Sequence, residues 1–196
     1  MFEAISPGMK ARMEELEAID TRDREDGTDI TRRLRQVPPE TGRFIALMAS
    51  LAPPGRYLEI GTSAGYSTMW LSLACRALGR TLTTFEVLPN KIELARETFQ
   101  RAGIEDIVEL VHGDAREHLP GLDGIAFCFL DAEKDVYTGC YDLLVPRMVP
   151  GGLMVADNVT SHADDLAPFV AHVLADPRVD ATVVTFAKGE LLARKR

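Results

Sequence analysis

The sequence predicts an α/β fold in which helices cover both faces of a twisted, mostly parallel β-sheet. From residue 56 onward, short apolar segments that suit strands alternate with segments of helical spacing, and such alternation builds a parallel sheet through right-handed crossovers. The segment 124–131 is apolar almost throughout, as expected for a central strand covered on both faces.

The elements of the first half follow from their boundaries. Residues up to about Val37 are charge-rich and helical in pattern, and Pro38-Pro39 breaks this stretch. Pro89 begins and Gly103 ends a later helix whose apolar residues recur at helical spacing. The predicted elements are a helix at 42–52, a strand at 56–60, a turn at 61–65, a helix at 66–78, a strand at 81–87 and a helix at 89–102.

The second half continues the alternation. The predicted elements are strands at 107–113 and 124–131, a helix at 136–148, a strand at 151–158, a helix at 163–175 and closing strands at 181–186 and 190–195. A tight turn at Lys188-Gly189 joins the last two strands. This connection is too short for a crossover, so one of the two must run antiparallel.

The composition is that of a globular protein, with 46% hydrophobic and 27% charged residues. The length favours one domain, 1–196, in which residues 1–37 contribute to a substrate lid or a dimer contact. The net charge of −8 argues against nonspecific nucleic-acid binding. No apolar run approaches the roughly 20 residues that span a bilayer, and no signal peptide is evident, so we expect a cytoplasmic protein without membrane contact.

A glycine-containing loop between the first strand and its helix indicates a nucleoside site. Gly61 and Gly65 allow a tight turn and close approach of a ligand, and the loop has the pattern ExGxxxG, starting at Glu59. Glu86 ends the next strand, where a carboxylate can meet ribose hydroxyls, and Asp114 follows the third strand, where it can accept from an adenine amino group. The GxGxxG of dinucleotide-binding oxidoreductases is absent.

Oxygen-bearing side chains end two strands that we expect to be neighbours. Asp131 ends the fourth predicted strand, and Asp157 and Asn158 end the fifth. Adjacent strands lie about 4.8 Å apart, so these groups can reach one ion. Two carboxylates and an amide suit Mg²⁺.

Two further residues fall close to this expected metal site. Lys134 follows Asp131 by one turn of chain, and a nearby divalent cation disfavours its charged form, so it is a candidate general base. His162, a few residues beyond Asn158, is more suited to lining the substrate pocket than to binding the metal.

Three segments together, YLEIGTSAGYS, FCFLDAEKDVY and GGLMVADNV, resemble the metal-dependent catechol and caffeoyl-CoA O-methyltransferase family from about Val37 to the C-terminus. The resemblance implies a seven-stranded Rossmann-like fold with an antiparallel last strand, S-adenosylmethionine as cofactor, a divalent cation and a homodimer. It also implies Asp131, Asp157 and Asn158 as metal ligands and Lys134 as the base. The residues expected around the cofactor are Val37, Glu59, Gly61, Ser63, Gly65, Tyr66, Ser67, Glu86, Val87, Asp114, Ala115 and Asp131.

The sequence departs from the family pattern near the substrate. Ser161 stands where an aromatic residue often forms a wall, followed by His162. The closing turn is Lys188-Gly189 instead of Asp-Gly, and Thr182 falls near the position of a pocket glutamate in the catechol-specific branch. These departures bear on which substrate is used and not on the cofactor.

The predicted function is transfer of a methyl group from S-adenosylmethionine to a hydroxyl of a small, metal-chelated, catechol-like substrate, with Lys134 and Asp131 as catalytic residues. A tRNA methyltransferase acting on a hydroxylated uridine is a rival hypothesis, supported only by the cluster of Arg32, Arg33 and Arg35. A nucleotide-binding oxidoreductase and a binding protein without catalysis are two further hypotheses for a chain of this fold class.

Overall fold

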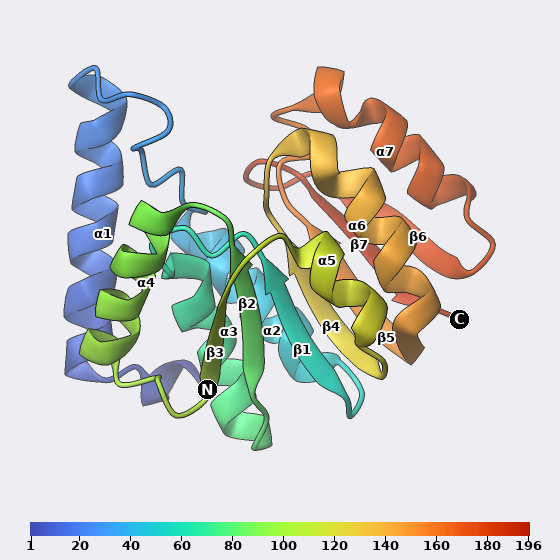
Figure 1. The fold of residues 1–196 in the computed structure, drawn as a ribbon, viewed down its shortest axis with the longest axis horizontal. Helices are drawn as coiled ribbons and strands as arrows, with labels where there is room; N and C mark the ends of the chain where they lie inside the picture. Colours follow the sequence, from blue (N-terminus) through green and yellow to red (C-terminus); the bar gives the residue numbers. More distant parts are fainter.

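The computed structural model describes all 196 residues and has a seven-stranded sheet at its centre (Figure 1). The strand order is β3-β2-β1-β4-β5-β7-β6. Six strands run in one direction, and β7 is antiparallel to its neighbours β5 and β6, which confirms the predicted α/β fold with an antiparallel last strand. The strands are β1 (Arg56–Ile60), β2 (Leu82–Glu86), β3 (Val108–His112), β4 (Ile125–Leu130), β5 (Met148–Ala156), β6 (Val179–Val184) and β7 (Glu190–Lys195).

Helices cover both faces of the sheet (Figure 1). Two buried clusters form the core, one on each face, so that Phe127 and Phe129 of β4 enter one cluster while Cys128 and Leu130 enter the other. The alternation follows from the two-residue period of a strand. The helices on one side are α1 (Pro7–Glu25), α2 (Pro39–Leu51), α3 (Tyr66–Leu78) and α4 (Pro89–Ala102), and those on the other are α5 (Ala115–His118), α6 (Tyr137–Leu144) and α7 (Ala163–Ala175).

Most predicted boundaries agree with the structure to within a few residues, and α3 begins and ends as predicted. However, β5 already begins at Met148, and β6 ends at Val184, so five residues separate it from β7 where a tight turn was expected. The helix α5 and the 3₁₀ turns at Leu119–Gly121 and Lys134–Val136 were not predicted, because three or four residues show no periodicity.

The prediction of helix up to about Val37 was wrong. The helix α1 ends at Glu25, and no further α-helix forms before α2. Asp26 and Asp29 each accept a hydrogen bond from the backbone N–H two residues later, at 2.9 Å, and from that threonine's hydroxyl. Gly27 between them is left-handed, with φ of 81°. Such local side-chain bonds compete with the helix, which explains why it stops here.

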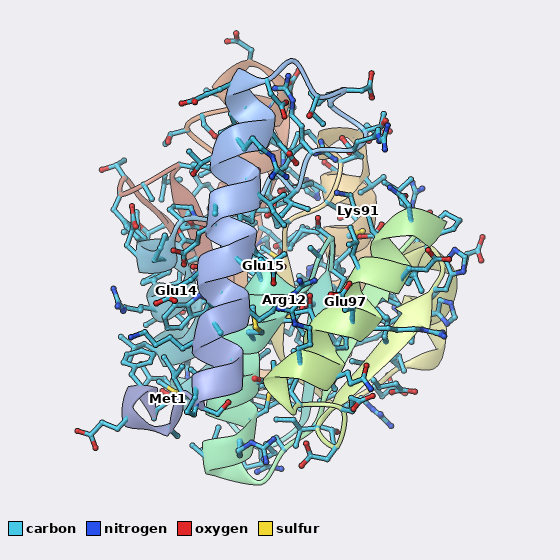
Figure 2. The ribbon with its side chains drawn as sticks, turned by 90° about the vertical axis from the view of Figure 1, so that its left-hand side faces the viewer. Met1, Arg12, Glu14, Glu15, Lys91 and Glu97 are labelled. Atoms are coloured by element: carbon cyan, nitrogen blue, oxygen red, sulfur yellow. The ribbon has the colours of Figure 1, made fainter.

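An ion-pair cluster fastens α1 to α4, with Arg12 at its centre (Figure 2). The side chain of Arg12 is buried, and its Nε donates to Thr98 Oγ1 at 3.0 Å. Its Nη1 lies 2.9 Å from Glu15 and 3.4 Å from Glu97. The long N-terminal helix is therefore part of the packed structure, and the chain that follows it is brought to the edge of the sheet.

The sheet has a crevice at the carboxyl ends of its central strands. The chain passes from β1 to β2 on one side and from β4 to β5 on the other, so the loops that follow β1 and β4 diverge. Ligands bind α/β sheets at such a switch point. None of the helices combines the length and apolar character that crossing a membrane requires.

Candidate functional site

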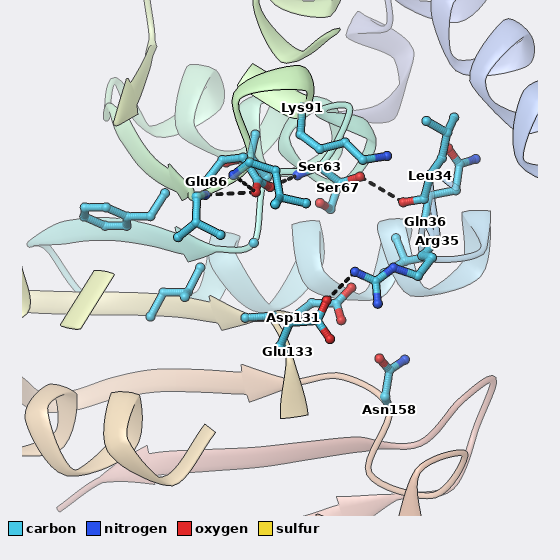
Figure 3. A pocket seen from close by; sticks show the side chains of 18 of the residues that line it. Leu34, Arg35, Gln36, Ser63, Ser67, Glu86, Lys91, Asp131, Glu133 and Asn158 are labelled. Atoms are coloured by element: carbon cyan, nitrogen blue, oxygen red, sulfur yellow. Dashed lines mark hydrogen bonds and ion pairs between the residues drawn. The ribbon is translucent and has the colours of Figure 1, made fainter. Parts of the chain in front are cut away.

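A cavity of about 570 Å³ lies at this crevice and is lined by residues that follow β1 to β5 (Figure 3). Residues between α1 and α2 also line it. Of the residues predicted for the site, Glu59, Gly65 and Asp157 do not line the cavity and are buried. Those that line it are Val37, Gly61, Ser63, Tyr66, Ser67, Glu86, Val87, Asp114, Ala115, Asp131, Lys134 and Asn158.

The two glycines of the loop after β1 are required by the backbone. Gly61 has φ of 102°, and a Cβ placed on it would lie 2.0 Å from the carbonyl oxygen of Asp131. Gly65 has φ of 85°, and a Cβ there would lie 2.7 Å from the ring of Phe99. These positions let the loop turn tightly against β4 and begin α3 at the cavity wall.

Glu59 supports the loop from below and does not face the cavity. Its carboxyl is fully buried and accepts hydrogen bonds from Ser67 Oγ at 2.5 Å, Thr84 Oγ1 at 2.7 Å and Thr68 Oγ1. Burial raises the pKa of Glu59 to about 7, although these three hydroxyl donors act in the opposite direction. Ser67 therefore lies on the cavity wall, and Glu59 lies behind it and holds its hydroxyl by a hydrogen bond.

Glu86, at the end of β2, lines the cavity with its carboxylate already oriented (Figure 3). Its Oε2 accepts from the backbone N–H of Ser63 at 2.8 Å, and its Oε1 accepts from those of Val87 and Leu88, both at 2.9 Å. A carboxylate has about four lone-pair sites, so acceptor capacity remains for hydroxyl donors of a ligand.

Asp114 caps the short helix α5 and is held by a neighbour. Its oxygens accept from the backbone N–H of Arg116 at 2.9 Å and from the guanidinium Nη2 of the same residue at 2.6 Å. The Arg116 guanidinium lowers the pKa of Asp114. Asp114 is thus kept as an anion at the cavity, and an amino group of a ligand would share it with Arg116.

The three predicted metal ligands meet at the ends of β4 and β5. The N–H of Asp131 donates to Ile60 O at 2.9 Å and the N–H of Asp157 to Leu130 O at 3.0 Å, so these strand ends remain paired. Asn158 adopts a left-handed conformation, with φ of 70°, which asparagine tolerates well. Its Nδ2 donates to Asp157 Oδ2 at 2.8 Å.

The ammonium group of Lys134 lies between two of these predicted ligands. Its Nζ donates to Asn158 Oδ1 at 2.6 Å and to Asp131 Oδ1 at 3.3 Å. It also donates to the hydroxyl of Tyr137 at 2.9 Å, and that hydroxyl donates to Asp157 O at 3.2 Å. Tyr137 was not predicted as a site residue, although it stands one helical turn after Lys134. The site therefore holds a positive charge among the oxygens of both strand ends.

A second buried carboxyl, Glu190 at the start of β7, lies beside Asp157 and was also missed. Neither residue is exposed, and the oxygens without a hydrogen-bond donor are Asp157 Oδ1 and Glu190 Oε2. Burial raises the pKa of both; repulsion from Asp131 adds to this for Asp157, and repulsion from Asp157 adds to it for Glu190. These two buried oxygens are therefore open to a proton or to a cation. Thr182, near the position of the family's pocket glutamate, does not line the cavity.

The segment 26–38, here called the strap, runs along the open side of the cavity between α1 and α2 (Figure 3). Three side chains from other elements donate to its main-chain carbonyls: Lys91 Nζ at 2.7 Å, Ser63 Oγ at 2.8 Å and Lys188 Nζ at 3.2 Å. Lys91 and Lys188 were not predicted, because bonds to main-chain carbonyls leave no pattern in the sequence.

The loop after β5 gives the cavity a polar wall close to Asn158. Ser161 and His162 both line the cavity, and Ser161 Oγ lies 3.1 Å from His162 Nδ1. The predicted absence of an aromatic side chain at this position leaves the wall open and able to form hydrogen bonds.

Comparisons with known proteins agree with this geometry. Residues 13–196 match the family model described as O-methyltransferase. A catechol O-methyltransferase of Mycobacterium tuberculosis is 38% identical over 125 residues, which are 63% of this chain and 56% of that protein. A caffeoyl-CoA O-methyltransferase of Populus kitakamiensis is 26% identical over 186 residues, covering 81% of this chain and 77% of that protein. The chain thus aligns with little more than half of the length of the bacterial catechol enzyme.

A solved structure is similar over nearly the whole chain. The O-methyltransferase from Bacillus cereus in complex with SAH is 25% identical, covers 95% of this chain and 91% of that one, and has a TM-score of 0.78. The match of the family model to most of the chain, together with the predicted motifs and the fold, shows that this chain belongs to the O-methyltransferase family.

Proposed function

We propose that this protein transfers a methyl group from S-adenosylmethionine to a hydroxyl of a small aromatic substrate with vicinal hydroxyls, and that a divalent cation, Mg²⁺, assists. The SAH complex of the Bacillus cereus relative supports the cofactor, because SAH is the product left after methyl transfer. The catechol enzyme of Mycobacterium tuberculosis supports the substrate class. The carboxylates of Glu86 and Asp114, which line the cavity, are groups suited to binding the ribose hydroxyls and the adenine amino group of this cofactor.

One observation carries the metal part of the proposal: Lys134 bridges Asp131 Oδ1 and Asn158 Oδ1, while Asp157 Oδ1 is buried without a donor. Oxygens that hold an ammonium group this closely also suit a cation, and an orphaned buried carboxylate oxygen is costly unless something binds it. No three His, Cys, Asp or Glu side chains cluster in the chain, and the proposed set needs only two carboxylates and an amide. When bound, the cation would orient two vicinal oxygens and favour ionisation of the one to be methylated.

The remaining roles fall to the protein's own side chains. A divalent cation held by Asp131 and Asn158 would favour the neutral amine of Lys134, and that amine is placed to accept the proton of the attacked hydroxyl. The hydroxyl of Tyr137 holds Nζ of Lys134 in place. Glu86 would receive the ribose hydroxyls. The strap excludes water from one side, which fits the proposed role of residues 1–37 as a lid.

The test is a methyl-transfer assay of the purified chain with S-adenosylmethionine and either catechol, phenol or bulk tRNA, each with Mg²⁺ or after exhaustive chelation. We expect catechol alone to be methylated, only with Mg²⁺, while affinity for SAH survives chelation. Undiminished turnover after chelation would contradict the metal role. Methylation of tRNA alone would favour a tRNA methyltransferase, for which the site offers no specific support.

A matched pair of variants distinguishes loss of a metal ligand from the mere loss of one negative charge. Asp157→Asn removes a buried carboxylate at the proposed ligand position, whereas Asp164→Asn makes the same change on an exposed residue that does not line the cavity. We expect Mn²⁺ binding, followed by electron paramagnetic resonance, to weaken by about 10–100-fold in the first variant only. The homodimer and the cytoplasmic location stay predictions.

A further inference from the structure

Arg35 lies on the strap in a conformation that few residues adopt. Its φ is 51°, in the left-handed region, where a non-glycine residue is strained and is worth examining for a function. The three hydrogen bonds to the strap's carbonyls hold the backbone there. As a result the side chain points toward the mouth of the cavity, above Asp131 and Asn158 (Figure 3).

The partner of Arg35 is Glu133, across the mouth of the cavity. The side chains of this pair are 47% and 62% exposed. An ion pair in such contact with water contributes little to stability, so another anion can take the place of Glu133 at little cost.

A second cation lines the cavity from the same side. Lys188 forms no ion pair; its Nζ donates only to the carbonyl of Gln36, at 3.2 Å. The acids nearest to the reaction centre, Asp131 and Asp157, are committed to the proposed cation. The strap side of the substrate end therefore carries two positive groups, of which one is weakly paired and the other unpaired.

We propose that Arg35 is a specificity-determining residue that binds a carboxylate of the substrate, so that the preferred substrates are aromatic acids with vicinal hydroxyls. This inference rests on the proposed function and narrows its substrate class. The guanidinium fork matches a carboxylate in two parallel hydrogen bonds, and the substrate's carboxylate exchanges with that of Glu133. The vicinal hydroxyls then lie toward Asp131 and Asn158, below the strap.

The experiment compares kcat/KM for 3,4-dihydroxybenzoate and for its neutral amide, 3,4-dihydroxybenzamide. The two have nearly the same shape, so we expect the unmodified protein to prefer the acid by roughly 10–100-fold, the range of a hydrogen bond to a charged group. Arg35→Asn should abolish most of this preference. Asparagine is chosen because it suits the left-handed backbone at this position. The intrinsic reactivities of the two substrates cancel when the ratio of their kcat/KM values is compared between proteins.

Arg32→Asn is the matched control, because Arg32 is also an exposed arginine of the strap but does not line the cavity. It should retain the preference for the acid. Arg35→Lys, which keeps the charge but not the fork, should give an intermediate ratio. Calorimetric titration with SAH should give the same affinity in all four proteins.

Three outcomes would overturn the inference. The first is equal methylation of acid and amide by the unmodified protein, a result that stands even if Arg35→Asn fails to fold. The second is full retention of the preference for the acid in Arg35→Asn. The third is loss of affinity for SAH in this variant, which would assign Arg35 to the carboxylate of the cofactor. Failure of the proposed function itself is recognised separately, because then none of the proteins methylates 3,4-dihydroxybenzoate or its amide.

Discussion

The buried carboxyl of Glu59 makes a quantitative prediction about stability and pH. Its pKa is raised from 4.5 to about 7 by burial, so the folded state holds the proton more tightly than the unfolded chain does. A group of this kind contributes stability that is fully present below the unfolded pKa and is lost as pH rises through the folded pKa. A difference of about 2.5 pKa units at 1.36 kcal/mol each gives a total effect of about 3.4 kcal/mol. About 2 kcal/mol of this is lost between about pH 5.5 and about pH 8, because part of the loss already occurs as pH rises from 4.5 to about 5.5.

Replacing Glu59 by Gln removes the ionisation and keeps an acceptor for the hydroxyls of Ser67, Thr68 and Thr84. We therefore expect the free energy of unfolding of the variant, relative to the unmodified protein, to rise by about 2 kcal/mol between these two pH values. Urea denaturation at both values measures this directly. The same substitution at the exposed Glu105 serves as a control and should show little of this change. Parallel pH profiles for the Glu59 variant and the unmodified protein would refute the reasoning, because Glu59 would then be ionised at no cost in the folded state.

Three further substitutions test other parts of the structure. Lys134→Met should lower kcat by about 10²–10⁴-fold while calorimetry shows similar affinity for SAH; a kcat near that of the unmodified protein would give the proton transfer to another group. Gly61→Ala should lower both Tm and SAH affinity, because its Cβ would lie 2.0 Å from the carbonyl oxygen that follows β4; unchanged binding would mean that the loop can move away. Arg12→Met should cost about 1–3 kcal/mol in urea unfolding, because it leaves the buried hydroxyl of Thr98 without its partner, whereas Lys10→Met, at a side chain 72% exposed, should cost little.

The predictable part of the site lies at strand ends. Glu86 is the last residue of β2, and Asp131 and the pair Asp157-Asn158 directly follow the apolar ends of β4 and β5; parallel strands bring such positions to one edge of the sheet. The functional residues that were missed are of another kind. In the sequence, Glu190 cannot be told from any other acidic residue at the start of a strand. Only the pairing of β7 with β5 shows that it is buried beside Asp157.

The strap likewise differs between what its sequence predicted and what the folded chain shows. Charge-rich composition up to Val37 predicted a helix, but the side chains of Asp26 and Asp29 bond to the backbone just ahead of them and stop it. The cluster of Arg32, Arg33 and Arg35 was the only support in the sequence for a tRNA substrate. The folded chain instead sends Arg35 to the mouth of the cavity, through contacts with Ser63 and other residues far away in the sequence.

Local patterns in the sequence were sufficient to determine the α/β alternation, the glycine loop after β1 and the order of the acidic strand ends, because each depends on the period of a strand or helix and on the residue that ends it. Only the tertiary structure decided which of these acids face the cavity, that Glu59 and Asp157 lie beneath its wall, and that Lys134 and Arg35 meet the oxygens across from them. Those facts depend on burial and on contacts between residues up to 152 positions apart in the sequence, and no local pattern carries that information.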